Sequence, residues 1–281
     1  MHDQLRIRQA VDFLEQNLDQ PISLDTLAEV GCYSKYHFHR LFQAYTGETL
    51  LKFHRRLRLE RAAGKLLIAN DPITEVAMAA GFDSPSAFNK AFKAQFGCTP
   101  SHFKETGPLG LERPTPLPEI SPIRPEGFDP QVVERPEQQW LSCRGTGAYQ
   151  TAAQEAFGKL MAICGQLGWL QQPPETLNFY GIPRDNPSIT ESDLIRYDAC
   201  IEVLEPNKSL SQLATLRTRP KGRYLRFEHH GGVSSISKSY GYFYRYWLPD
   251  SGLQPGVEPG FEHYIDWQDP EHSPVAIYIP L

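Results

Sequence analysis

The chain lacks the patterns that mark membrane-spanning and secreted proteins. Across its 281 residues, no apolar run approaches the roughly 18 residues that a membrane span requires. The first residues predict an amphipathic helix and have no continuous apolar centre of the kind that a signal peptide needs. We therefore expect a cytoplasmic protein that has no membrane partner.

Cysteine is scarce, and the usual metal and phosphate motifs are missing. The five cysteines are scattered and show no Cys-x-x-Cys pair or Cys/His ligand spacing, so buried thiols are expected rather than disulfides. His229 and His230 are accompanied by no Cys, Asp or Glu set at ligand spacing. The turn at residues 144–147 lacks the lysine of a phosphate-binding loop. No metal and no cofactor are expected.

A strong basic excess is also missing, because the formal net charge is −5. The charge is divided unevenly: residues 1–110 carry 13 Lys and Arg against 12 Asp and Glu, and the remainder carries 15 against 21. Six bases fall on one predicted helix, namely Lys52, Arg55, Arg56, Arg58, Arg61 and Lys65. Such a cluster can neutralise phosphates, although a solvated helix face is the alternative.

What the chain does contain is an internal repeat. One set of residues matches another at a constant offset: Phe38, Phe42, Gly47 and Thr49 align with Phe88, Phe92, Gly97 and Thr99. Each copy predicts a short helix (24–30 and 73–80), a tight turn, and a longer helix with an apolar stripe. Two helix-turn-helix units are therefore expected.

The glycines and capping residues of the repeat define the turns. Gly31 and Gly81 are expected to adopt the positive φ of a tight turn. The second helix is expected to begin at Ser34 in one copy and at Asp83 or Ser84 in the other. Two apolar stripes should face the core: Phe38, Leu41, Phe42 and Tyr45 in the first copy, and Phe88, Ala91, Phe92 and Phe96 in the second.

A bridging helix is predicted over residues 50–67, between the two units. Recognition helices that enter successive major grooves must lie about one turn of B-DNA apart, roughly 34 Å. A rigid helical spacer suits that requirement.

Three runs carry a resemblance to a known family: SLDTLAEVGCYSKYHFHRLFQAYTGETL, RRLRLERAAGKL and ITEVAMAAGFDSPSAFNKAFKAQFGCTP. They resemble the DNA-binding domain of AraC-family transcription regulators over about residues 5–103. The resemblance implies double-stranded DNA as a partner and allows RNA polymerase as a further one. It also implies DNA contacts from the outward positions of the two longer helices: Lys35, Tyr36, His39, Arg40, Pro85, Ser86, Asn89 and Lys90.

Individual roles follow from side-chain chemistry. Arg40 is the best candidate for a bidentate contact to guanine, with His39 and Tyr36 beside it. Asn89 could read adenine, whereas Ser86 and Lys90 could equally contact phosphate.

Composition changes after the repeat. Six prolines between residues 107 and 129 favour extended geometry and predict a linker. We expect an all-α DNA-binding domain over residues 1–106, the linker over residues 107–128, and a second domain over residues 129–281.

The second domain reads as α+β, with two strand-helix-strand halves. Strands are predicted at 131–135, 139–145, 178–182, 197–204, 221–229, 262–266 and 275–279, and helices at 151–167 and 234–247. Glycine-bearing turns precede both helices, so the halves are expected to be an internal duplication that packs around a shared cleft.

This part resembles GyrI-like effector-binding domains in the runs VVERPEQQWLSCRGTGAYQTA, RYDACIEV, GRYLRFEHHGGVSSISKSYGYFYRYWLPDSGL, FEHY and IYIPL. An AraC-type first domain joined to a GyrI-like second domain resembles the Rob-like type of regulator. The resemblance implies a small effector, often cationic or aromatic.

Strand alternation places Glu262 and Tyr264 on one face, and Phe261 and His263 on the other. A carboxylate that faces a cleft is costly to desolvate unless a cation neutralises it, and aromatic rings would strengthen that contact. Seven aromatics are available for the wall: Tyr149, Trp169, Tyr180, Phe227, Tyr242, Tyr246 and Trp247. For any single one, ordinary core packing is the alternative.

The sequence thus predicts a transcription regulator, not an enzyme, with an effector site at Glu262. Two alternatives stay open. The second domain could be a small-molecule hydrolase in which Glu262 and Tyr264 act as acid and base. It could instead be a ligand-free protein-interaction module, which predicts a filled, dry cleft.

Overall fold

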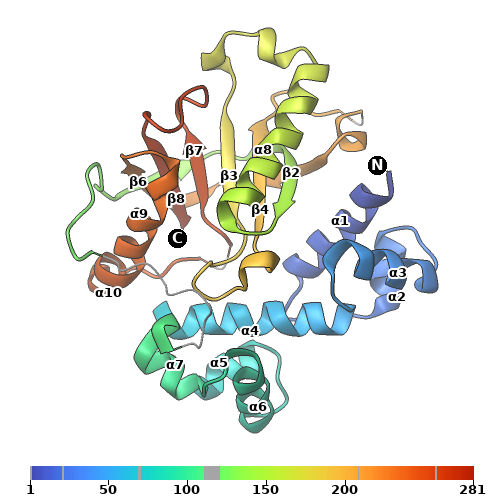
Figure 1. Ribbon diagram of the computed structural model, residues 1–281, viewed down its shortest axis with the longest axis vertical. Helices are drawn as coiled ribbons and strands as arrows, with labels where there is room; N and C mark the ends of the chain where they lie inside the picture. Colours follow the sequence, from blue (N-terminus) through green and yellow to red (C-terminus); the bar gives the residue numbers. More distant parts are fainter. Residues whose placement is uncertain (1, 21, 69–70, 111–120, 208, 257) are drawn as a thin grey trace. The chain divides into compact units, whose positions relative to one another are not determined.

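The computed structural model describes residues 2–20, 22–68, 71–110, 121–207, 209–256 and 258–281. The chain divides into two compact units, Met1–Leu117 and Pro118–Leu281 (Figure 1). Much of the predicted linker, residues 111–120, lies outside the described residues. Within the described ranges, no helix is both long and apolar enough to cross a membrane.

The first unit is entirely helical. Its helices are α1 (His2–Gln16), α2 (Leu24–Val30), α3 (Lys35–Thr46), α4 (Leu50–Ile68), α5 (Ile73–Ala79), α6 (Pro85–Phe96) and α7 (Pro100–Thr106). The pairs α2–α3 and α5–α6 are the two predicted helix-turn-helix units, and α4 is the predicted bridge. Ser84 rather than Asp83 caps α6, since its hydroxyl accepts a hydrogen bond from the Ala87 amide.

The first turn corrects the expectation for Gly31. Gly31 has a φ of −77°, and the positive φ belongs to the next residue, Cys32 (53°), whereas Gly81 has a φ of 70°. The backbone bonds show that Cys32 and Gly81 hold equivalent places. Tyr33 N donates to Ala28 O (2.8 Å), and in the other copy Phe82 N donates to Ala77 O (3.2 Å). The expectation failed because the turn lies one residue later than the glycine.

Each helix-turn-helix unit is packed around phenylalanines. In one unit the buried Phe38 and Phe42 pack with Phe53 of α4. In the other, the buried Phe88, Phe92 and Phe96 pack with Phe103 of α7. Tyr45, which was expected in the core, is instead 37% exposed. The inward position is taken by the half-buried Thr46, one residue further along the helix.

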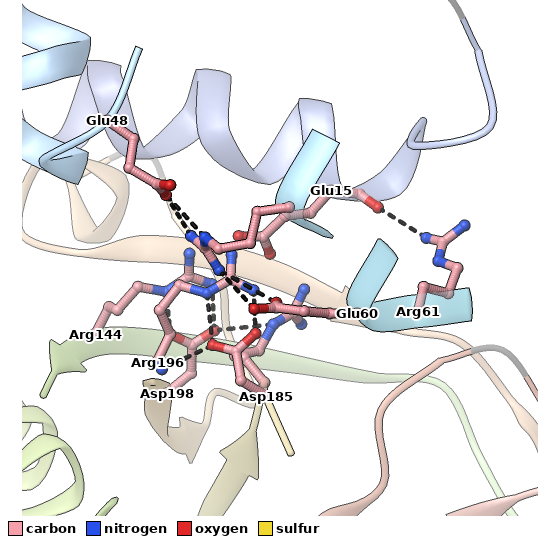
Figure 2. A network of polar contacts seen from close by, with 10 residues as sticks. Glu15, Glu48, Glu60, Arg61, Arg144, Asp185, Arg196 and Asp198 are labelled. Atoms are coloured by element: carbon pink, nitrogen blue, oxygen red, sulfur yellow. Dashed lines mark hydrogen bonds and ion pairs between the residues drawn. The ribbon is translucent and has the colours of Figure 1, made fainter. Parts of the chain in front are cut away.

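The six bases of α4 do not form one exposed cluster. The Arg56 side chain donates to Glu48 (2.8 Å) and to Glu60 (3.2 Å). The Arg58 guanidinium donates to the Ala80 carbonyl and lies over the Phe82 ring. Figure 2 shows Glu48, Glu60 and the contact from Arg61 to the Glu15 carbonyl. Lys52 and Arg55 are exposed and remain the candidates for phosphate contacts on this helix.

The second unit is an eight-stranded sheet with helices. Its strands are β1 (Gln131–Arg135), β2 (Gln138–Thr146), β3 (Phe179–Pro183), β4 (Arg196–Glu202), β5 (Thr215–Arg219), β6 (Gly222–His229), β7 (Phe261–Tyr264) and β8 (Val275–Pro280). Its helices are α8 (Tyr149–Gln166), α9 (Ile236–Tyr242) and α10 (Leu248–Ser251), the last two joined by a π-helical turn, Phe243–Trp247. Short 3-10 turns in this unit lie at Trp169–Gln171, Pro174–Thr176, Ser192–Leu194, Leu210–Gln212 and Val233–Ser235, and one in the first unit lies at Gly107–Gly110.

The sheet confirms the predicted duplication. The strand order is β1-β6-β8-β7-β3-β4-β2-β5, and every neighbouring pair is antiparallel. Outward from the central β3–β7 pair, the order is β4, β2, β5 on one side and β8, β6, β1 on the other. The edge strand on each side comes from the other half of the domain, since β1 pairs with β6 and β5 pairs with β2. Strand β5 was not predicted from the sequence. The single helix predicted over residues 234–247 is α9 followed by a π-helical turn.

One face of the sheet packs against α8 and α9; in Figure 1, α8 lies by β3 and β4, and α9 lies separately from it, by β8. Phe128, placed in the linker from the sequence, belongs to this core: it is 2% exposed and its ring lies 4.7 Å from that of Phe227. The opposite face carries a tight aromatic cluster, in which Trp140 stacks on Tyr180 at 4.4 Å. Arg144 on this second face donates two hydrogen bonds to Asp198, at 2.7 and 2.9 Å (Figure 2).

Candidate functional sites

The outward face of α3 carries the four residues predicted to contact DNA. Lys35, Tyr36, His39 and Arg40 are all exposed, and Tyr36 reaches 88% exposure. The buried Phe38 and Phe42 hold the opposite side of the helix, so the face is fixed by the core rather than by mutual contacts. Lys35 pairs with Asp25 of α2 at 2.8 Å, but both side chains stay more than half exposed. The guanidinium of Arg40 is therefore the more available cation on this face.

The outward face of α6 is built in the same manner. Its four predicted contacts, Pro85, Ser86, Asn89 and Lys90, are exposed, while Phe88 and Phe92 are buried on the other side. Pro85 occupies the first turn of the helix, where its missing N–H costs no hydrogen bond. Both faces thus have the polar, solvent-accessible character that contact with DNA requires, and those contacts remain a prediction.

A cavity of about 410 Å³ lies in the second unit, on the helix-covered face of the sheet. This size falls in the ordinary range for small-molecule pockets, roughly 300 to 1,000 Å³. Its walls are mainly apolar and come from α8, β3, the start of α9 and the segment between β7 and β8. They include Ala153, Phe157, Met161, Phe179, Ile236 and Trp267.

Glu262 lies at the buried end of this cavity with 1% of its surface exposed. Four tyrosine hydroxyls donate hydrogen bonds to its carboxylate. Tyr149 (2.8 Å) and Tyr240 (3.2 Å) bond to Oε1, and Tyr197 (2.5 Å) and Tyr264 (2.9 Å) bond to Oε2. The donors come from α8, α9, β4 and β7, so four separate elements converge on one carboxyl group.

The electrostatics of the group follow from its burial. Burial raises the pKa of Glu262 above its ordinary value of 4.5, and the tyrosine hydrogen bonds oppose part of that rise. Burial, followed by the negative charge of Glu262, also raises the pKa of each surrounding phenol, in Tyr149, Tyr197, Tyr240 and Tyr264. The phenols therefore stay protonated and act as donors. The site combines a buried carboxylate with aromatic walls, which suits a cation that carries apolar groups.

Gly181 makes this arrangement possible. It pairs with Glu262 across β3 and β7, and a Cβ at this position would overlap the Tyr197 hydroxyl. It would also lie 3.0 Å from the Glu262 carboxylate. A side chain at residue 181 would therefore occupy the space in which Tyr197 reaches Glu262.

Comparison with known proteins matches both units. Residues 27–106 match the helix-turn-helix domain family, and residues 128–281 match the family of GyrI-like small molecule binding domains. The chain is 33% identical over 111 residues to the multiple antibiotic resistance protein MarA of Escherichia coli, covering 40% of this chain and 87% of that protein. The chain belongs to the AraC-type transcription regulators with a GyrI-like domain.

Two further known proteins are similar to this AraC-type chain. It is 37% identical over 118 residues to the right origin-binding protein of Escherichia coli K12, and spans about two fifths (41%) of that relative's length and 41% of its own. A solved AraC-type regulator structure from Chromobacterium violaceum is 30% identical and covers 36% of this chain and 90% of that one, with a TM-score of 0.35.

Three of the nine residues that the sequence suggested for the effector site line the cavity. Glu262, Tyr264 and Tyr149 come together as described, with Phe261 and His263 on the opposite face as strand alternation predicted. Trp169, Phe227, Tyr242 and Trp247 were expected in the wall of the cavity as well. None of them is among the described residues that line the cavity, and all four pack in or against the hydrophobic core instead.

The core packing of these aromatics is specific. Phe227 stacks on Phe243 at 5.3 Å, and Tyr242 meets the Phe128 ring edge-on at 5.0 Å. Tyr197, Tyr240 and Gly181 were not predicted from the sequence. The glycine was the one available signal, since a glycine inside a strand often marks a close approach of other atoms. Among the described residues, no group of three or more His, Cys, Asp or Glu could hold a metal ion.

Proposed function

We propose that the protein is a cytoplasmic DNA-binding regulator of transcription whose GyrI-like domain binds a small, cationic aromatic effector. It acts on double-stranded DNA through the exposed faces of α3 and α6. RNA polymerase is a further partner in this proposal, because a regulator must finally change the engagement of polymerase. The single observation that carries the effector half is the buried Glu262 carboxylate at the end of an apolar cavity.

The DNA half is supported by the repeated geometry of the first unit. The same phenylalanine pair holds the inner side of each second helix, and polar residues occupy each outer side. Arg40 on α3 has the chemistry to read guanine, and Asn89 on α6 has the chemistry to read adenine. The bridging helix α4, 19 residues long, is the rigid spacer that two adjacent half-sites need.

The proposal of effector binding depends on the free-energy cost of burying the Glu262 carboxylate away from water. Among the described residues that line the cavity, tyrosine hydroxyls bond to Glu262 and no Lys, Arg or His offers a counter-charge. A lipophilic cation supplies that charge while its rings contact Phe157, Phe179 and Trp267. Binding changes the activity on DNA only if the ligand favours one conformation or partner state over another.

Selection of DNA from a random library tests both halves together. The full-length chain is used, with and without a panel of lipophilic cations and uncharged aromatic compounds. The expected result is a two-part motif spaced by about one helical turn, with occupancy that changes only with the cations. Absence of an enriched motif would contradict the DNA half, and a motif with occupancy unaffected by every compound would contradict the effector half.

One observation favours a second candidate, hydrolysis of a reactive small molecule. Tyr264 and Glu262 lie 2.9 Å apart inside the cavity, within reach for proton transfer. Turnover of a bound compound that is lost in Glu262→Gln would support this candidate, and recovery of unchanged compound from the complex would count against it. The cavity itself does not fit a ligand-free interaction module, which requires a filled cleft.

A further inference from the structure

The cavity contains a second carboxylate, at a different depth from the first. Among the described residues that line it, Glu262 and Glu271 are the two carboxyl groups, and no Lys, Arg or His joins them. Glu262 is buried on β7, whereas Glu271 is exposed on the segment between β7 and β8. The lining is therefore acidic at its closed end and acidic at its mouth.

The position of Glu271 is fixed by its surroundings. Ser234, in the 3-10 turn that precedes α9, donates its hydroxyl to Glu271 Oε2 at 3.2 Å. Gly232 has a φ of 79°, and a Cβ there would overlap both the Glu271 carboxylate and its backbone carbonyl. The neighbouring His272 donates to Asp269 (2.7 Å) rather than to Glu271. The Glu271 carboxylate is thus held at the mouth and keeps acceptor capacity for a ligand.

The rest of the cavity lining is mainly apolar and includes several aromatic rings. Phe157, Phe179 and Trp267 belong to it, and the Phe179 and Trp267 rings lie 4.9 Å apart. Such a wall offers contacts to a flat aromatic body and no fixed positive charge that would repel a cation.

We propose that the cavity selects elongated ligands that carry a basic group at each end of an aromatic body, with one group at Glu262 and the other at Glu271. This inference rests on the proposed effector function and adds Glu271 as a specificity-determining residue. A ligand with one charge engages Glu262 alone. A ligand with two charges gains a second ion pair at the mouth, and because that pair is exposed, its contribution is modest and screened by salt.

A matched pair of probes tests the second contact. DAPI has an amidinium group at each end of a flat aromatic body, and its analogue with one amidinium replaced by a neutral carboxamide keeps the shape. Dissociation constants are measured by fluorescence on full-length protein freed of nucleic acid, at low and at physiological salt. The variants are Glu271→Gln, Glu262→Gln and, as a control, Glu205→Gln, which alters an exposed carboxylate outside the cavity lining.

The expected result is that wild type binds DAPI about two- to fivefold more tightly than the analogue at low salt. Glu271→Gln should abolish that difference and leave the analogue unaffected, and Glu262→Gln should weaken both probes. Equal affinity for the two probes, with Glu271→Gln silent, overturns the second contact but leaves the effector function standing. Binding of neither probe by wild type overturns both.

Discussion

In the AraC-type unit the candidate DNA contacts lie on the exposed faces of α3 and α6, whereas in the GyrI-like unit the central candidate contact, Glu262, is buried. Arg40 and Asn89 are exposed, and the core of their unit is instead formed by phenylalanines on the opposite sides of α3 and α6. The Glu262 carboxylate instead accepts hydrogen bonds from tyrosines on four elements, so the residues that form the site also hold these elements together. Substitutions should accordingly separate function from stability in the first unit and couple them in the second.

The largest expected effect is on stability, at a residue that aromatic character alone suggested for the effector site. Phe227→Ala removes a fully buried ring that packs on Phe128 and Phe243. The free energy of unfolding of the GyrI-like unit should fall by about 3 to 5 kcal/mol. Denaturant unfolding measures this loss, and Phe227→Leu should lose less. If a Phe227 variant bound the effector more weakly while its stability was unchanged, Phe227 would be a contact of the effector.

A smaller effect, on DNA alone, is expected at Arg40. Arg40→Ala should cost about 1 to 3 kcal/mol of binding free energy and relax base preference at one position of the site. Stability should be unchanged because the side chain is exposed. Binding to a library of operator variants measures the preference. The control is Arg55→Ala on α4, which should weaken every sequence equally; the same uniform loss for Arg40→Ala would make Arg40 a phosphate contact.

The affinity for a permanently charged ligand should depend on pH through Glu262. Because burial raises the pKa of Glu262, a cation must displace a proton at low pH. Affinity for tetraphenylphosphonium should therefore rise with pH, by up to about tenfold per unit, and level off above the raised pKa.

The same raised pKa has a consequence for stability. Ligand affinity should rise with pH, whereas the contribution of Glu262 to stability should fall with pH, because the folded protein holds this proton more tightly than the unfolded chain does. The contribution of Glu262 to stability is therefore fully present below about the ordinary pKa of 4.5, and falls as pH rises through the raised value.

Calorimetric titration with tetraphenylphosphonium across this pH range measures the predicted change in affinity. In Glu262→Gln the affinity should not change with pH. An affinity that rises with pH in that variant as well would assign the proton to another group.

The smallest effect is expected where the two helix-turn-helix copies differ. Cys32 adopts a positive φ that Gly81 adopts in the other turn. Cys32→Gly should relieve backbone strain and stabilise the AraC-type unit by up to about 1 kcal/mol. Thermal unfolding of the full chain measures the gain. A loss of stability would mean that the cysteine side chain contributes more than the strain costs.

The contrast between the units also explains what the sequence could predict. Helical spacing places Phe38 and Phe42 inward and Arg40 outward within a few residues, so the first unit follows from local pattern. Strand alternation likewise placed Glu262 and Tyr264 on one face. Tyr197 and Tyr240 could not be found in this way, because they lie 65 and 22 residues from Glu262 and reach it through strand pairing and helix packing. Aromatic type alone did not distinguish Tyr149 at the site from Phe227 in the core.

The central claim is that Glu262 supplies the charge that recognises a cationic effector. Calorimetric titration of the full-length protein with tetraphenylphosphonium tests it most directly, in wild type, Glu262→Gln and Glu205→Gln. Wild type and Glu205→Gln should bind alike, and Glu262→Gln should bind about 10- to 100-fold more weakly, since contacts to charged groups contribute about 1.5 to 3 kcal/mol. Equal affinity of all three proteins would contradict the claim and remove Glu262 from the effector site.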